Sequence, residues 1–110
     1  MAKFGGFGGG GNMNQMMMQA RKMQQDLQRA QEEIADTEVI GTAGGEMVEV
    51  VLTGDKKMVS VSIDPKAVDP DDIEMLEDLL VAAFNAAMEE ADKLSAEKLG
   101  PMANMLGGMR

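Results

Sequence analysis

The segment EMVEVVLTGDKKMVSVSID, residues 46–64, has the pattern of a β-hairpin. In both halves Val, Leu or Ile recurs at every second residue, as in strands that bury one face. The two halves, 46–53 and 58–64, are separated by residues 54–57, a short loop that starts with a glycine. We therefore expect two antiparallel strands with one half-buried face and one wet face. The apolar face is formed by Val48, Val50, Leu52, Val59, Val61 and Ile63.

A shorter strand-like stretch, Glu38 to Thr42, lies before the hairpin and is followed by the Gly44-Gly45 pair. With the hairpin it predicts a three-stranded antiparallel sheet. So small a sheet leaves two edges and needs a covering layer.

Residues 12–36 precede the sheet and are rich in Gln, Met, Arg, Lys and Glu, with no Gly or Pro. This composition predicts a long helix, capped by Asn12 or Asn14 and roughly 36 Å in length. Its seam repeats at spacings of 3 and 4, which is an a/d heptad pattern, although Ala and Met make it a weak one. The seam consists of Met13, Met16, Ala20, Met23, Leu27, Ala30 and Ile34.

A second long helix is expected to open at Asp69-Pro70, with Asp69 as the N-cap, and to run to about Leu99 before Gly100-Pro101. The acidic residues around its start could suggest a cation site, but a cap in the positive field of the first turn explains them better. The apolar stripe of this helix is broad enough to cover the sheet. It includes Leu76, Leu80 and Phe84, which we place in the core or dimer interface with the hairpin residues.

The order is therefore αβββα, an α+β fold with a long N-terminal helix, a three-stranded antiparallel sheet and a long C-terminal helix. We expect a flexible Gly-rich tail at residues 1–11, one domain at residues 12–99 and a flexible tail at residues 100–110. The exposed seam and the sheet edges leave a single chain incomplete. A closed two-fold homodimer is the simplest assembly that would cover them.

The composition argues against most enzyme chemistry. The 110 residues contain no Cys, His, Trp or Tyr, which removes thiolate and imidazole nucleophiles and metal ligands. We expect no catalytic residue, no metal, no cofactor and no small-molecule substrate. No signal peptide and no membrane-spanning run are visible, so the expected location is the cytoplasm.

The formal net charge of −9 is divided unevenly along the chain. Residues 1–31 contain four basic residues and one acidic residue, a net charge of +3, whereas residues 32–110 have a net charge of −12. With Met13 at heptad position a, three of the basic residues fall at positions b and c, on the outward side of the helix. This stripe is either a solvated flank or a phosphate-binding surface. The four basic residues are Lys3, Arg21, Lys22 and Arg29.

Several segments, in this order, resemble the YbaB/EbfC family of bacterial nucleoid-associated proteins. They are the Gly-rich opening, the Met/Gln-rich first helix, VIGTAGG at residues 39–45, the Gly54 hairpin, VSIDP at residues 61–65 and EMLEDLLVAAFNAA at residues 74–87. The resemblance implies a homodimer whose subunits pair through their sheets and second helices, with long helices projecting like the arms of tweezers. It also implies DNA binding without catalysis, and it places Arg21, Lys22 and Arg29 on the projecting arm.

Two functions follow as hypotheses. The first is a cytoplasmic, nucleoid-associated homodimer that binds duplex DNA, with weak or no sequence specificity, through phosphate contacts from the first helix, and that serves nucleoid organisation or gene regulation. The alternative is a chaperone-like or scaffold clamp whose Met-rich helical arms grip apolar protein partners.

Overall fold

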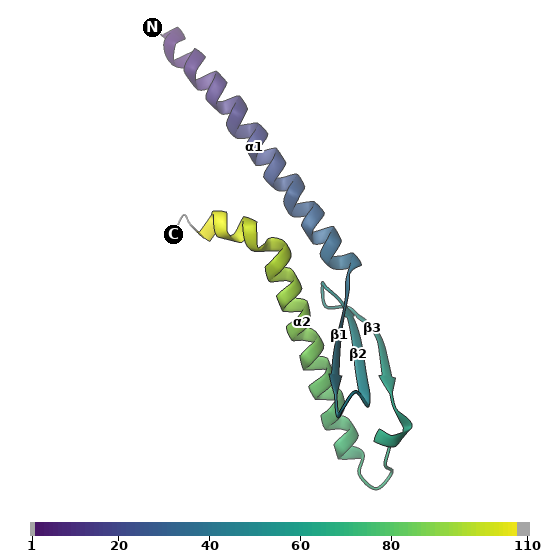
Figure 1. The fold of residues 1–110 in the computed structure, drawn as a ribbon. Coiled ribbons are helices and arrows are strands. Elements are labelled where there is room, and N and C mark those ends of the chain that lie inside the picture. Colours follow the sequence, from purple (N-terminus) through teal and green to yellow (C-terminus); the bar gives the residue numbers. More distant parts are fainter. Residues whose placement is uncertain (1, 108–110) are drawn as a thin grey trace.

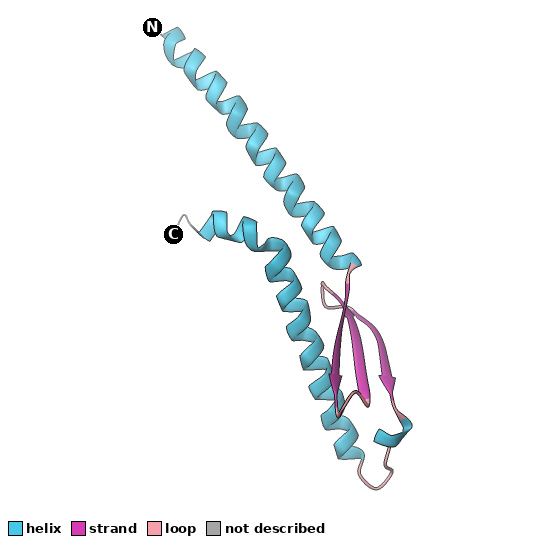
Figure 2. Cartoon of the chain, viewed as in Figure 1, coloured by secondary structure: helices cyan, strands magenta, loops and turns pink. Residues whose placement is uncertain are grey.

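A computed structural model describes the backbone of residues 2–107 and the side chains of residues 13–100. The chain forms two long helices and a three-stranded sheet, with a single 3-10 turn after the last strand (Figures 1 and 2). The molecule is elongated, with a longest dimension of 86 Å, because α1 extends far beyond the sheet. The predicted αβββα order and α+β class are confirmed. The elements are α1 (Ala2–Asp36), β1 (Glu38–Ala43), β2 (Val48–Thr53), β3 (Met58–Ile63), η1 (Pro65–Ala67) and α2 (Ile73–Gly107).

The strands are antiparallel in the order β1-β2-β3, as the hairpin pattern predicted. β2 begins at Val48 and not at Glu46, because Gly44, Gly45 and Glu46 all have positive φ and form the turn that follows β1. A residue in the left-handed region does not continue a strand. The alternation within β2 is as expected, since Val48, Val50 and Leu52 are buried.

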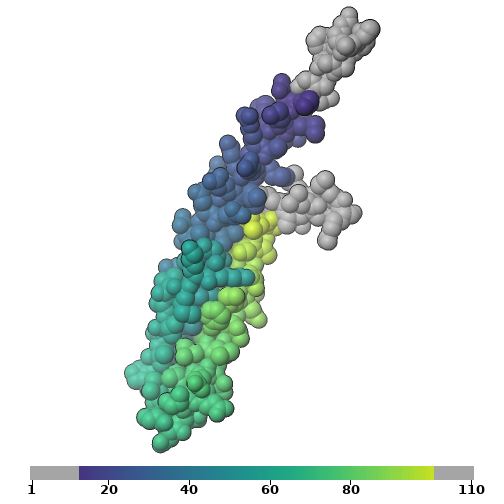
Figure 3. Space-filling model, turned by 180° about the vertical axis from the view of Figure 1, so that it is seen from behind, coloured from purple at the N-terminus to yellow at the C-terminus, as the bar shows by residue number. Residues whose placement is uncertain are grey.

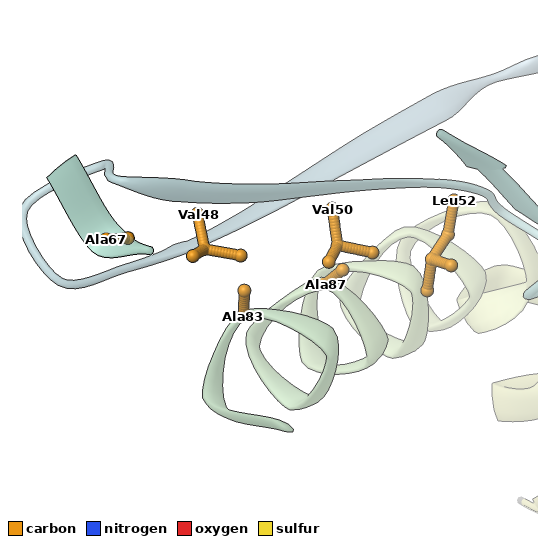
Figure 4. Packing of buried hydrophobic residues seen from close by; sticks show 6 residues of the cluster. All are labelled: Val48, Val50, Leu52, Ala67, Ala83 and Ala87. Atoms are coloured by element: carbon orange, nitrogen blue, oxygen red, sulfur yellow. The ribbon is translucent and has the colours of Figure 1, made fainter. Parts of the chain in front are cut away.

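One face of β1 and β2 is covered by α2. Figure 4 shows Val48, Val50 and Leu52 pointing from β2 toward Ala83 and Ala87 of α2, with Ala67 at the end of the cluster. The predicted residues Leu76, Leu80 and Phe84 are partly buried and pack against this cluster. The small residues Ala83, Ala87 and Ala91 are the fully buried part of the helix.

The strand β3 is not covered in the same way. Val48 pairs with Ile63 and Val50 with Val61, so these β3 side chains lie on the same face of the sheet as the core. Nevertheless Val59, Val61 and Ile63 are 48%, 40% and 38% exposed. The expectation that the whole apolar face of the hairpin is half-buried is therefore wrong within a single chain, because α2 packs mainly on β1 and β2. The place of these three residues in a dimer interface stays a prediction.

The helix ends differ from those expected. The N-cap of α2 is Asp72, whose carboxylate accepts a hydrogen bond from the Met75 backbone N–H at 3.1 Å. Asp69 instead accepts one from Asp71, in the turn that precedes the helix. An acidic residue of this cluster thus caps α2, as expected, but it is Asp72 and not the predicted Asp69, which was three residues too early.

Both helices also run farther than predicted, since α1 begins at Ala2 and α2 continues through Gly100-Pro101 to Gly107. Glycine is a poor helix former but does not forbid a helix, and a proline inside a helix produces a bend of the kind seen near the end of α2 (Figure 1). The division into tails at residues 1–11 and 100–110 and a domain at residues 12–99 stays a prediction. The side chains of residues 1–12 and 101–110 lie outside the described part of the chain.

Candidate nucleic-acid interface

The root of α1 packs on the body of the molecule, whereas the rest of the helix projects. Ala30 and Ile34 are buried, and toward the N-terminus the same seam becomes open, with Met13 and Met16 61% and 67% exposed. Figure 3 shows the root of α1 beside α2 and the sheet, with the rest of the arm extending beyond them. The helix therefore forms an arm with one end anchored.

Three predicted basic residues lie on this arm. With about 3.6 residues per turn, Arg21 falls on the side of α1 opposite the buried Ala30 and Ile34, and Lys22 and Arg29 fall together on the adjoining flank. All three are exposed. Within residues 13–100 none of them forms an ion pair or a side-chain hydrogen bond. Their charges are available to an anionic partner.

The fourth predicted residue, Lys3, lies in α1, but its side chain is outside the described residues.

The lysines of the body are in a different situation, because several are paired with carboxylates. Lys56 contacts Asp92 at 2.6 Å, Lys93 contacts Glu90 at 3.1 Å, and Lys98 of α2 contacts Glu33 of α1 at 3.3 Å. The last pair joins residues that are 65 positions apart and could not be predicted from the sequence. Pairing reduces what α2 offers to an anion, so α2 does not form a second basic arm equivalent to α1.

The charge on the outward face of α1 changes from positive to negative toward the body. From Arg21 to Arg29 the face is basic, and closer to the body the exposed carboxylates of Glu32 and Asp36 fall on the same side of the helix. Arg21 is fifteen residues, roughly 22 Å, from Asp36. This is more than twice the screening length of about 8 Å at physiological salt. The basic end of the arm is thus electrostatically separate from the acidic body.

Two apolar surfaces complete the set of candidate sites. A shallow hollow of about 310 Å³ on the arm is lined by Met13, Met16, Met17 and Ala20. The second surface is the open face of β3 described above. The hollow is the feature that the alternative clamp hypothesis requires.

The described residues contain no group of acidic side chains arranged to hold a metal ion. In the same part of the chain, neither helix has a stretch long and apolar enough to cross a membrane.

Residues 9–106, nearly the whole chain, match the family model described as the YbaB/EbfC DNA-binding family. The chain belongs to this family. The resemblance of its segments to YbaB/EbfC proteins is thus confirmed, and the family is nucleoid-associated and bacterial.

Relatives within the YbaB/EbfC family cover most of the chain. A nucleoid-associated protein of Streptomyces griseus subsp. griseus is 57% identical over 101 residues, which is 92% of this chain and 89% of the relative. One from Acetivibrio thermocellus is 46% identical and covers 99% of this chain and 96% of its own. The crystal structure of an uncharacterized protein from Helicobacter pylori has a TM-score of 0.67, covering 84% of this chain and 95% of that one. At 24% identity, it supports the fold alone.

Proposed function

We propose that this protein binds duplex DNA in the bacterial nucleoid, as a homodimer, through phosphate contacts made by α1. The observation that carries the proposal is the exposed, unpaired triad Arg21, Lys22 and Arg29 on an arm of a YbaB/EbfC family member. Lys and Arg are the usual partners of DNA phosphates, and phosphate contacts carry no sequence information directly. The contacts position the protein on DNA with weak or no sequence preference. This mode suits a role in nucleoid organisation or gene regulation.

The homodimer accounts for the uncovered face of β3. Val61 and Ile63 continue the buried face of β2 but lack a covering layer in a single chain, and Val59, at a bulge in the β2–β3 register, is exposed as well. A two-fold interface can use the same patch on both subunits, so a second copy covers both patches at once. The dimer then carries two α1 arms.

The acidic body limits where DNA lies. Residues 32–110 have a formal net charge of −12, and this charge includes the carboxylates of Asp69, Asp71 and Asp72 just before α2. A polyanion is repelled by such a surface at short range. DNA therefore contacts the arms and avoids the sheet and the first turns of α2.

A salt titration of DNA binding tests the proposal. Residues 1–31 contain four basic residues, so two copies offer eight, and the slope of log K against log salt is no steeper than about −7. The triple variant Arg21→Ala, Lys22→Ala, Arg29→Ala removes six of the eight, and its slope becomes shallower by about 5. Binding by this variant is at the limit of detection in physiological salt.

A matched control removes the same charge from the body. The triple variant Lys57→Ala, Lys66→Ala, Lys93→Ala keeps the arm intact and changes the net charge equally, so its slope stays close to that of the unaltered protein. Fluorescence polarisation on a short duplex measures the DNA affinity and the salt slope of both triple variants. Equal losses of DNA affinity in the two variants would show that the total charge, and not the arm, governs binding, and would overturn the site assignment.

The methionine-lined hollow supports a second candidate function, a clamp for apolar protein partners. Met side chains adapt to varied partners, and Met13, Met16 and Met17 are all more than half exposed. The substitutions Met13→Gln and Met16→Gln separate the two functions. They abolish capture of protein partners from nuclease-treated lysate if the hollow is the site, and they leave DNA binding unchanged.

A further inference from the structure

The arm leaves the body at a close contact around Gly54, the first residue of the turn between β2 and β3. A Cβ atom at this position would overlap the backbone oxygen of Ile34 and lie 2.7 Å from both the Ile34 Cγ2 and the Leu94 Cδ2. Ile34 is in the last turn of α1 and Leu94 is in α2. The glycine therefore occupies a space between the two helices that no larger residue fits.

A hydrogen bond ties the same glycine to the chain segment that follows the arm. The Gly54 N–H donates to the backbone carbonyl oxygen of Thr37 at 2.8 Å. Thr37 is the single residue between α1 and β1. Thr37 also closes the end of α1, because its hydroxyl donates to the Glu33 carbonyl at 2.6 Å. Figure 1 shows this turn beside the root of α1. We call Ile34, Thr37, Gly54 and Leu94 the arm joint.

Gly54 is needed for space and not for its backbone conformation. The described glycines with positive φ are Gly44 and Gly45, and Gly54 is not among them. An alanine at position 54 is therefore compatible with the local backbone, and the atoms nearest to its methyl group belong to α1 and α2.

We propose that Gly54 is a positioning residue for DNA binding, because it sets the angle at which α1 leaves the body and so the places of Arg21, Lys22 and Arg29. This inference rests on the proposed function of α1. It adds that the direction of the arm, as well as its charge, determines affinity. The residue acts through α1 and does not touch DNA.

Two ion pairs also link the elements around the joint, but they constrain the direction of α1 less than the steric contact at Gly54 does. Lys98–Glu33 links the arm to α2, and Lys56–Asp92 links the hairpin turn to α2. The four side chains are 37% to 63% exposed, and exposed ion pairs contribute little to stability. The overlap with a backbone atom, in contrast, is relieved only by movement of an element.

The arm amplifies a small movement at the joint. Ordinary carbon contacts lie at 3.4 Å or more, so an added methyl group displaces the last turn of α1 by roughly 1 Å. If α1 pivots at Thr37, Ile34 is about 4.5 Å and Arg21 about 24 Å from the pivot. Arg21 then moves by about 5 Å, which exceeds the rise of about 3.4 Å between nucleotides of one strand. Lys22 moves by a similar amount, so both residues lose their register with the phosphates, whereas Arg29, about 12 Å from the pivot, moves by less than about 3 Å.

The test compares Gly54→Ala with Gly100→Ala, a matched control in α2 whose added Cβ meets no atom within 4 Å. Since the chain contains no Cys, cysteines introduced by Gln15→Cys and Glu77→Cys are the only sites for spin labels. Labelled chains are diluted into an excess of unlabelled chains of the same variant, and the separation of the two labels is measured by pulsed electron paramagnetic resonance. Circular dichroism and solution mass verify fold and assembly.

We expect Gly54→Ala to shift the mean label separation by about 3–6 Å and Gly100→Ala to leave it unchanged. On unlabelled protein, Gly54→Ala weakens the phosphate contacts of Arg21 and Lys22 in both subunits, up to about four per dimer, so its salt slope becomes shallower by about 1 to 4. A folded Gly54→Ala variant with an unchanged label separation overturns the proposal. So does a shifted separation with unaltered DNA affinity. Absence of DNA binding by the unaltered protein would instead overturn the proposed function.

A second variant applies if Gly54→Ala does not fold. Ile34→Ala removes the Cγ2 methyl and the rest of the side chain beyond Cβ from the joint, adds no bulk, and lets α1 change its direction. The expected result is a broader distribution of label separations with weaker DNA binding, and a distribution as narrow as that of the unaltered protein contradicts the proposal. A merely structural role for the joint lowers the unfolding midpoint without altering the label separations.

Discussion

Gly41 of β1 and Ala87 of α2 meet backbone to backbone. A Cβ on Gly41 would overlap the Ala87 nitrogen and lie 2.7 Å from its Cα. Ala83 and Ala91 flank this contact one helical turn away on either side, and all three alanines are fully buried. The glycine and the alanine stripe together let α2 lie directly on the sheet.

The first prediction follows from this contact. Gly41→Ala cannot be accommodated by a change of rotamer, because the conflicting atoms belong to the helix backbone. We expect it to lower the free energy of unfolding by about 3 kcal/mol or more, at the upper end of overpacking effects. Urea denaturation followed by circular dichroism measures the loss. Gly100→Ala is the control and leaves stability unchanged or slightly raised, since alanine is the better helix former. Equal stability of the two variants contradicts the close contact.

The second prediction concerns the open face of β3. Val61→Glu places a charge where we propose that a second copy packs, so the dimer mass is lost while the chain stays folded, because Val61 is 40% exposed within one subunit. Light scattering coupled to size exclusion measures the mass. Ile40→Glu is the matched control on the opposite face of the sheet, where Ile40 is also exposed, and the dimer persists. A dimer that survives Val61→Glu would place the interface elsewhere.

The third prediction separates the two candidate caps of α2. Asp72→Ala removes the side chain that accepts the Met75 N–H, and we expect a loss of about 1 kcal/mol in the free energy of unfolding. Asp69→Ala removes the same charge but affects only the preceding turn, so its cost is smaller. Thermal unfolding of both variants shows which substitution costs more stability. A larger loss for Asp69→Ala than for Asp72→Ala would mean that Asp69 is the cap.

Much of this fold is predictable from local pattern. The alternation of Val48, Val50 and Leu52 predicts a strand and its buried face, and the seam from Met13 to Ile34 predicts a helix with an outward basic side. Both signals depend only on backbone periodicity. The exposure of Arg21, Lys22 and Arg29 therefore follows from sequence as well, although their contact with DNA remains a proposal.

The rest depends on contacts between distant segments. Nothing local shows that Gly41 meets Ala87, yet this contact places α2 over β1 and β2 and leaves Val61 open. The space that Gly54 leaves for the root of α1 is equally invisible in a hairpin loop where glycine is common. The ion pair between Lys98 and Glu33 depends on the packing of α2 against α1. Local pattern thus predicts the elements and the charged face, and tertiary contacts decide the direction of the arm.

The last prediction tests the change of sign along the arm. Glu32 lies on the outward face of α1, three residues beyond Arg29, and a phosphate that approaches Arg29 also approaches this carboxylate. At 10 Å in water the repulsion between two unit charges is about 0.4 kcal/mol before screening. Glu32→Gln therefore tightens DNA binding by about twofold at low salt, and the gain disappears near 0.5 M salt, where the screening length is roughly 4 Å. Glu77→Gln removes the same charge from the exposed side of α2, seventeen residues or roughly 26 Å along the helix from Leu94 at the arm joint. Repulsion over such a distance in water is only about 0.1 kcal/mol before screening, so this substitution leaves the affinity almost unchanged. A polarisation titration with both variants provides the comparison, and an equal gain in the two would mean that DNA responds to the net charge of the whole protein and not to the arm.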